Sequence, residues 1–193
     1  MLVAGLLVVV AAIGYQLPAS SSPKTPSDVP RQEHRGHHHG ALGEAGGAIT
    51  GDVSVFDDEL PGVARLDPDL LRALRAAATQ AADDGVEFFV DSGWRSRAYQ
   101  GRLFSEAVAK YGSEAEASRW VATPDTSAHV SGDAVDIGHA DARAWLSEHG
   151  AAYGLCQTYG NEPWHYELRP DAVAGGCPPV YADASQRPVT ADS

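Results

Sequence analysis

Four residues in the C-terminal half of the chain have the types and spacing of a catalytic metal site. His129 and Asp136 lie in the segment 127–136, and Glu162 and His165 belong to a Glu-Pro-Trp-His motif. A structural zinc usually has four protein ligands, often cysteines, whereas a catalytic zinc has three and leaves one position open. Two histidines and an aspartate with a glutamate to spare therefore predict a Zn²⁺ site that performs hydrolysis.

Glu162 has the character of a general base for such a site. Pro163 follows it directly, which disfavours a regular helix, so we expect a loop that enters a strand near His165. A carboxylate there can take a proton from a water activated by zinc and later give it to a leaving amine. The alternative interpretation of Glu162 is a carboxylate on a surface loop.

His129 and Asp136 are predicted to meet through a bend in the chain. Gly132 can supply a tight turn between a loop carrying His129 and a strand carrying Asp136. A helix could also bring the two residues to one face, but the glycine and the β-branched content favour the strand. Taken singly, the histidine could be a packed core residue and the aspartate a turn cap or ion-pair partner. The joint pattern favours the metal site.

Helices and short strands must position these residues. Helical spacing with start and stop signals predicts helices between Asp67 and Gly85, between Ser96 and Tyr111, from Glu114 to Trp120 and between Asp141 and Gly150. Strands are predicted at 86–90, 133–137, 155–158 and 164–168. Helices that precede and interrupt a few strands indicate an α+β fold with a small antiparallel sheet and helices packed around it.

Three blocks of the sequence resemble one known family. Ser127-x-His129-x-x-Gly132-x-Ala134-x-Asp136 and Glu162-x-x-His165 resemble the signature of the VanY-type D-Ala-D-Ala carboxypeptidases, and Ser92-Gly-Trp-Arg95-Ser-x-x-x-Gln100 resembles a third block. These zinc peptidases belong to the lysostaphin, D-Ala-D-Ala peptidase and hedgehog group. The resemblance covers roughly residues 62 to 170 and implies a hedgehog-like or D-Ala-D-Ala-peptidase-like fold.

The resemblance implies a role for each site residue. His129, Asp136 and His165 would bind zinc, Glu162 would be the catalytic base, and Arg95 would stabilise the developing oxyanion or hold the substrate carbonyl. An ion pair with Asp91 or another carboxylate is the alternative for Arg95.

Ser127 and Gln100 would contact substrate. Trp164 and Tyr166, together with Trp94, are expected to line the cleft, although aromatic residues here also suit a core. His139 is expected on the surface or beside the metal ligands.

The function implied is removal of the terminal D-Ala from peptidoglycan stem peptides that end in D-Ala-D-Ala. L-Ala-D-Glu or another peptidoglycan endopeptidase activity, or a D,D-dipeptidase activity, are alternatives, because specificity depends on loops. A non-catalytic zinc domain that binds wall peptide is the alternative from another class. The presence of both Glu162 and Arg95 disfavours it.

The flanking segments suggest an exported protein. The apolar run within residues 1–17 is shorter than the roughly 20 residues of a membrane span and fits the core of a signal peptide. We expect this segment to be cleaved as a signal peptide or to remain as a membrane anchor. Residues 18–50, rich in Ser, Pro, Gly and His, are predicted to be a disordered linker, in which a histidine cluster has no catalytic role. Residues 51–180 are then the zinc peptidase domain and 181–193 a flexible tail.

Charge and cysteine content add two further expectations. The net charge of −12 resides after Thr50, and an acidic domain is poorly suited to bind nucleic acid. Cys156 and Cys177 are the two cysteines of the chain, and in an exported protein they are expected to form a disulfide. We expect a monomer located outside the cytoplasm, secreted or membrane-anchored.

Overall fold

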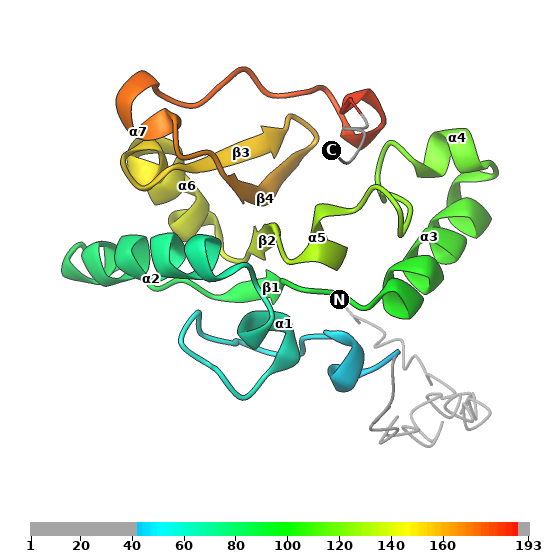
Figure 1. The fold of residues 1–193 in the computed structure, drawn as a ribbon, viewed down its shortest axis with the longest axis horizontal. Coiled ribbons are helices and arrows are strands. Elements are labelled where there is room, and N and C mark those ends of the chain that lie inside the picture. The colour runs from blue at the N-terminus through cyan, green and yellow to red at the C-terminus, as the bar shows by residue number, and fades with distance from the viewer. Residues whose placement is uncertain (1–41, 189–193) are drawn as a thin grey trace, which may run out of the picture. The chain divides into compact units, whose positions relative to one another are not determined.

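The computed structural model describes residues 42–188, whose centre is a small antiparallel sheet (Figure 1). Its strand order is β1-β2-β4-β3. The strands are β1 (Val90–Ser92), β2 (Ala134–Ile137), β3 (Leu155–Tyr159) and β4 (Glu162–Leu168). Helices surround this sheet, so the predicted α+β class is confirmed.

Two long helices and several short ones make up the rest of the described chain. The α-helices are α1 (Pro61–Ala64), α2 (Pro68–Asp83), α3 (Arg97–Tyr111), α4 (Glu114–Ala117), α5 (Ala128–Ser131), α6 (Ala140–His149) and α7 (Ala172–Gly175). The 3-10 turns are η1 (Glu44–Gly46), η2 (Gly150–Tyr153) and η3 (Ala184–Gln186).

The predicted N-caps of α2 and α3 are present. The Asp67 side chain accepts hydrogen bonds from the backbone amides of Asp69 and Leu70, and the Ser96 side chain accepts one from the Tyr99 amide. Within residues 42–188, no helix combines the length and apolar character needed to cross a bilayer.

The hydrophobic core lies between one face of the sheet and helices α2 and α6. Leu70 and Leu74 of α2 pack there with Trp145 of α6 and with Val135 and Tyr166 of the sheet. Because side chains alternate along a strand, the residues next to Val135 and Tyr166 point to the opposite face. The functional site is on that second face.

The first strand lies later in the chain than predicted. The apolar run at 86–90 predicts a strand, but β1 comprises Val90–Ser92. Its partner β2 is short and pairs with it from the Val90–Ile137 position onward. Before that position, Phe89 makes an isolated bridge with Ser54.

The folded domain extends beyond both predicted boundaries. Gly46 and Gly47, assigned to the linker, are buried, and the Gly46 carbonyl accepts a hydrogen bond from the Ser96 amide. A Cβ on Gly47 would lie 2.0 Å from the Trp94 carbonyl oxygen, so glycine permits this close approach of two backbones. This contact was not predicted, because the composition of residues 18–50, rich in Ser, Pro, Gly and His, indicated a linker. Residues 181–187, predicted to belong to a flexible tail, likewise pack on the domain. The segment 1–17, predicted to be a signal peptide or membrane anchor, lies outside the described residues.

A disulfide joins Cys156 of β3 to Cys177, which follows α7. The predicted pairing is thereby confirmed. The bridge closes a loop with a sequence separation of 21 residues that contains all of β4, the strand that carries Glu162 and His165.

We expect replacement of both cysteines by alanine to lower the free energy of unfolding by about 3 kcal/mol, because the closed loop limits the unfolded chain. Urea unfolding of both proteins, with and without reductant, measures this difference. Reductant should destabilise the unsubstituted chain and leave the Cys156→Ala/Cys177→Ala variant unchanged. Equal unfolding free energies for the two proteins under oxidising conditions would contradict the expectation.

Candidate metal centre and active site

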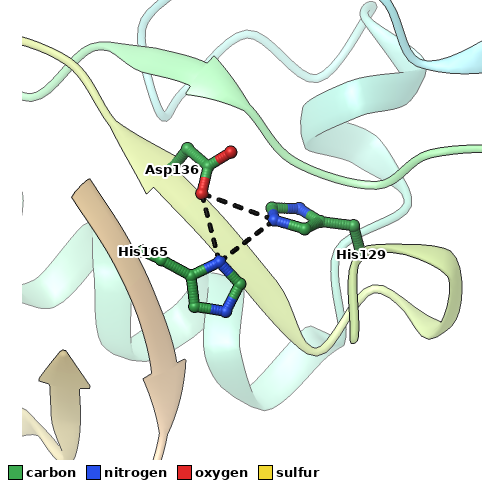
Figure 2. A group of neighbouring side chains, drawn as sticks. All are labelled: His129, Asp136 and His165. Carbon is green, nitrogen blue, oxygen red and sulfur yellow. Dashed lines mark hydrogen bonds and ion pairs between the residues drawn. The ribbon is translucent and has the colours of Figure 1, made fainter. Parts of the chain in front are cut away.

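Three side chains from separate elements converge on one point of the second sheet face (Figure 2). His129 comes from α5, Asp136 from β2 and His165 from β4, and all three are buried. His129 Nε2 lies 3.2 Å from His165 Nδ1 and 3.4 Å from Asp136 Oδ1, and the last two atoms are 3.2 Å apart. Two ligands of one tetrahedral zinc are about 3.3 Å apart at ordinary zinc–nitrogen distances. The donor set therefore fits a single zinc ion.

The approach of His129 to Asp136 depends on a turn at Gly132. This residue ends α5 with φ 89°, and its carbonyl accepts a hydrogen bond from the Asp67 amide. A Cβ there would lie 2.5 Å from the Arg65 carbonyl oxygen. The glycine bend and the strand position of Asp136 agree with the prediction. His129 itself lies on a single helical turn rather than in the expected loop, because a glycine in the left-handed region can end a helix as well as bend a loop.

Outer hydrogen bonds orient each of the three donor groups. His129 Nδ1 donates to the Gly93 carbonyl at 2.8 Å, and His165 Nε2 donates to Glu167 Oε1 at 3.1 Å. Asp136 Oδ2 accepts from the Arg95 guanidinium at 2.8 Å. The opposite nitrogen of each ring and Asp136 Oδ1 are thus directed at the shared point. Such partners fix the orientation and raise the basicity of metal ligands.

Burial and close charges shift the pKa values of these groups. Burial and the charge of Arg95 lower the pKa of His129. Burial alone would raise the pKa of Asp136, but the two histidines and Arg95 outweigh it and hold that pKa well below its usual range. Burial opposes the charged form of His165, yet its hydrogen bonds to Asp136 and Glu167 raise the pKa to about 9. The site therefore keeps Asp136 in its charged carboxylate form beside the two imidazoles.

Glu162 lies beside the three donors without joining them. Its Oε2 is 3.8 Å from His165 Nδ1, and the residue is 9% exposed. Burial raises the pKa of its carboxyl group to about 7, so this group can both accept and donate a proton near neutral pH. Glu162 is the first residue of β4 rather than part of a loop, because its partner Tyr159 pairs with it across an irregular end of the β3–β4 ladder.

A pocket of about 500 Å³ opens at these residues. The donors and Glu162 lie in its wall together with Arg95, Ser127, Tyr159 and Trp164. An apolar side of the same pocket is formed by α3 and the segment after α4, with Leu103, Tyr111 and Trp120. The metal centre is therefore accessible from a cavity large enough for part of a peptide.

Residues 63–171 match the family described as VanY, D-alanyl-D-alanine carboxypeptidase. The chain belongs to this family. A curated D-alanyl-D-alanine carboxypeptidase of Enterococcus faecalis (strain ATCC 700802 / V583) is 33% identical over 143 residues, which are 61% of this chain and 53% of that protein. The chain thus spans about half the length of this relative.

Two solved structures of VanY proteins resemble the described domain. VanYB in complex with D-Alanine-D-Alanine has 29% identity and a TM-score of 0.52, over 57% of this chain and 74% of that one. A mutant of the D,D-pentapeptidase VanY from a VanB-type resistance cassette, in complex with Zn(II), has 28% identity and a TM-score of 0.51, over 63% and 79%. The family resemblance deduced from the three sequence blocks is confirmed.

Arg95 in this VanY-family chain pairs with a carboxylate, but with Asp136 rather than Asp91. Its Nε donates to Ser92 Oγ at 2.7 Å and its Nη1 to Gln100 Oε1 at 3.0 Å. The Gln100 amide in turn donates to the Ala122 carbonyl at 2.7 Å. Gln100 is buried and uses both ends of its amide on protein groups, so it positions Arg95 at the pocket wall.

The structure places the other predicted contact residues in two groups. Ser127 and Trp164 line the pocket, and Trp164 is 38% exposed. Tyr166 does not: it is buried in the core on the far face of β4, and its hydroxyl donates to the Arg143 carbonyl. The prediction for Tyr166 was wrong because strand alternation directs it away from its neighbour His165. Trp94 lies under the Arg65 guanidinium, outside the pocket wall.

His139 also lies away from the metal centre. Its ring packs on Phe89, and its Nε2 is 3.5 Å from Asp52 Oδ1. This agrees with the expected surface position.

Glu167 is the functional candidate that the sequence analysis missed. It is 1% exposed and accepts from His165 on the metal face of β4. Burial opposes its charge, but the hydrogen bond from His165 and the positive charge of Arg187 lower its pKa to about 2. The signal was present in the sequence, since a residue two positions after a strand-borne ligand shares its face.

Proposed function

We propose that this chain is a zinc-dependent D-alanyl-D-alanine carboxypeptidase that removes the terminal D-Ala of peptidoglycan stem peptides. The observation that carries the proposal is the set of three donor atoms 3.2 to 3.4 Å apart, with Glu162 beside them in an accessible pocket. Membership of the VanY family supports it, as do relatives whose structures contain Zn(II) or D-Alanine-D-Alanine.

His129, Asp136 and His165 would hold the zinc ion. Bound there, zinc would polarise the scissile carbonyl and make a water molecule a stronger nucleophile. The hydrogen bonds to Gly93, Arg95 and Glu167 hold the three ligands in place before the metal binds, which limits rearrangement of the site.

Glu162 would act as the proton shuttle of the reaction. Its carboxylate takes a proton from the attacking water and gives it to the amino group of the departing D-Ala. Arg95, fixed by Ser92, Gln100 and Asp136, presents a positive charge at the pocket wall, where negative charge develops on the carbonyl oxygen.

Ser127 and Trp164 would contact the substrate from the pocket wall. The likeness to VanYB with bound D-Alanine-D-Alanine supports a peptide of that ending as substrate. The Cys156–Cys177 disulfide supports a location outside the cytoplasm, where such bonds persist. A stem peptide in the cell wall would be available in that location.

The test is release of D-Ala from a stem pentapeptide ending in D-Ala-D-Ala, followed by mass spectrometry with and without a zinc chelator. We expect one D-Ala per pentapeptide, complete loss of release in chelator, and recovery when zinc is added back. The tetrapeptide product and the free dipeptide D-Ala-D-Ala should remain uncut.

Other products would identify the alternatives. Cleavage between L-Ala and D-Glu would replace the proposal by an endopeptidase, and cleavage of the free dipeptide by a dipeptidase. Release that persists in chelator would reject the zinc mechanism. One bound zinc without turnover on any of these peptides would favour a non-catalytic binding domain.

A further inference from the structure

The C-terminal strap, residues 181–187, lies outside the family-matched region, which ends at residue 171, and packs beside the pocket. It pairs with the end of β3, where the Tyr181 amide donates to the Thr158 carbonyl at 3.0 Å. Asp183, almost fully buried, accepts from Arg119 at 3.1 Å and so ties the strap to the segment after α4. Ala184 lines the substrate pocket.

Arg187 at the end of the strap contacts two side chains that enclose His165. Its Nη1 donates to Glu167 Oε1 at 2.5 Å, the same oxygen that accepts from His165 Nε2. It also donates to the Tyr159 hydroxyl at 3.4 Å. The Tyr159 ring lies 4.9 Å, centroid to centroid, from the imidazole of His165. The Arg187 guanidinium thus contacts both the carboxylate that accepts from this imidazole and the tyrosine whose ring packs on it.

A second arginine provides an internal comparison. Arg169 donates to the other oxygen of the same carboxylate, Glu167 Oε2, at 2.8 Å. The two arginine side chains are similarly exposed, at 28% for Arg187 and 34% for Arg169. They neutralise the same buried charge, but only Arg187 contacts the oxygen that faces His165.

We propose that Arg187 is a positioning residue of the metal centre, and that the strap thereby helps set the zinc affinity of the site. The proposal rests on the proposed function, since it takes His165 as a zinc ligand. Groups that hydrogen-bond to metal ligands usually change metal affinity by about 10- to 100-fold when they are replaced. Arg187 acts one contact further out, through Glu167 and Tyr159.

The test measures zinc affinity by chelator competition on the 193-residue chain and its variants. Arg187→Gln should weaken zinc binding about tenfold, and Glu167→Gln at least as much. Arg169→Gln, which removes the same charge from the outer oxygen, should change it less than about threefold. Arg187→Lys should fall between Arg187→Gln and the unsubstituted chain, because it keeps the charge near Glu167 without the second contact.

A second readout separates positioning from a general loss of stability. The visible absorption of the cobalt(II)-loaded protein reports the arrangement of the ligands. It should differ from the unsubstituted spectrum in Arg187→Gln and match it in Arg169→Gln. If Arg187→Gln does not fold, Arg187→Lys carries the same two measurements.

Unchanged or tighter zinc binding in Arg187→Gln, or equal weakening in Arg187→Gln and Arg169→Gln, would overturn the proposal. Neither readout uses a peptide. A chain that binds zinc as expected but releases no D-Ala would reject the proposed activity and leave the role of the strap standing.

Discussion

Replacement of Glu162 by glutamine should lower kcat/KM for D-Ala release by about 10³-fold while the bound zinc remains. General acid–base groups contribute about 10²- to 10⁴-fold to rate, and this carboxylate is proposed to act at both proton transfers. Glutamine has nearly the same shape but cannot accept the proton. Glu162 lies outside the three-donor set, so its replacement leaves the ligands of the metal intact.

Three measurements establish this result: release kinetics on the pentapeptide, zinc content by elemental analysis, and thermal unfolding. Glu148→Gln is the matched control, since Glu148 is a well-exposed residue of α6 and its replacement is the same chemical change at a position away from the pocket. It should retain full activity. A Glu162→Gln variant with more than about a tenth of normal activity would remove this residue from the proton-transfer role.

The metal centre could be predicted from sequence because metal binding restricts residue type and spacing together. His129, Asp136 and His165 converge as expected, and Gly132 makes the turn between the first two. Helices α2 and α3 were predictable for a similar local reason, since their caps and apolar periods lie within the segments themselves.

Residues whose roles depend on partners distant in sequence could not be assigned in this way. Arg95 could be foreseen as pairing with a carboxylate, but the choice of Asp136 depends on the register between β1 and β2. The contribution of residues 181–187 was hidden for the same reason. Their sequence is polar and resembles a tail, and their order comes from pairing with the end of β3 and from the ion pairs of Asp183 with Arg119 and of Arg187 with Glu167.

Tyr166 was predicted wrongly because its position in the sequence was considered without the alternation of side chains along a strand. Its position next to His165 suggested a contact with the substrate, whereas strand alternation requires the two side chains to point apart. The same rule applied two residues further on would have identified Glu167 as a neighbour of His165.

Replacement of Asp136 by asparagine should abolish zinc binding and also destabilise the metal-free protein by about 3 kcal/mol. The first effect follows from loss of an anionic ligand. The second follows because the Arg95 guanidinium, 2.8 Å away and largely buried, would lose its charged partner. Breaking a buried ion pair on one side costs roughly 3–5 kcal/mol, since the remaining charge stays uncompensated.

Urea unfolding in excess chelator measures the stability effect, and chelator competition measures the loss of zinc. Asp133→Asn is the matched control: Asp133 is exposed, lies between α5 and β2, and accepts a hydrogen bond from Ser131. It should change the unfolding free energy by no more than about 0.5 kcal/mol and leave zinc binding unaffected.

A double variant separates the two roles of Asp136. Arg95→Met/Asp136→Asn removes both charges of the ion pair, so in chelator it should be more stable than Asp136→Asn alone, because no uncompensated buried charge remains. Zinc binding should remain absent, because the ligand is still missing. The comparison also needs the single variant Arg95→Met. If the stability losses of Arg95→Met and Asp136→Asn add up to the loss in the double variant, the Arg95–Asp136 pair contributes nothing to folding, and Arg95 is held at the pocket wall by Ser92 and Gln100 alone.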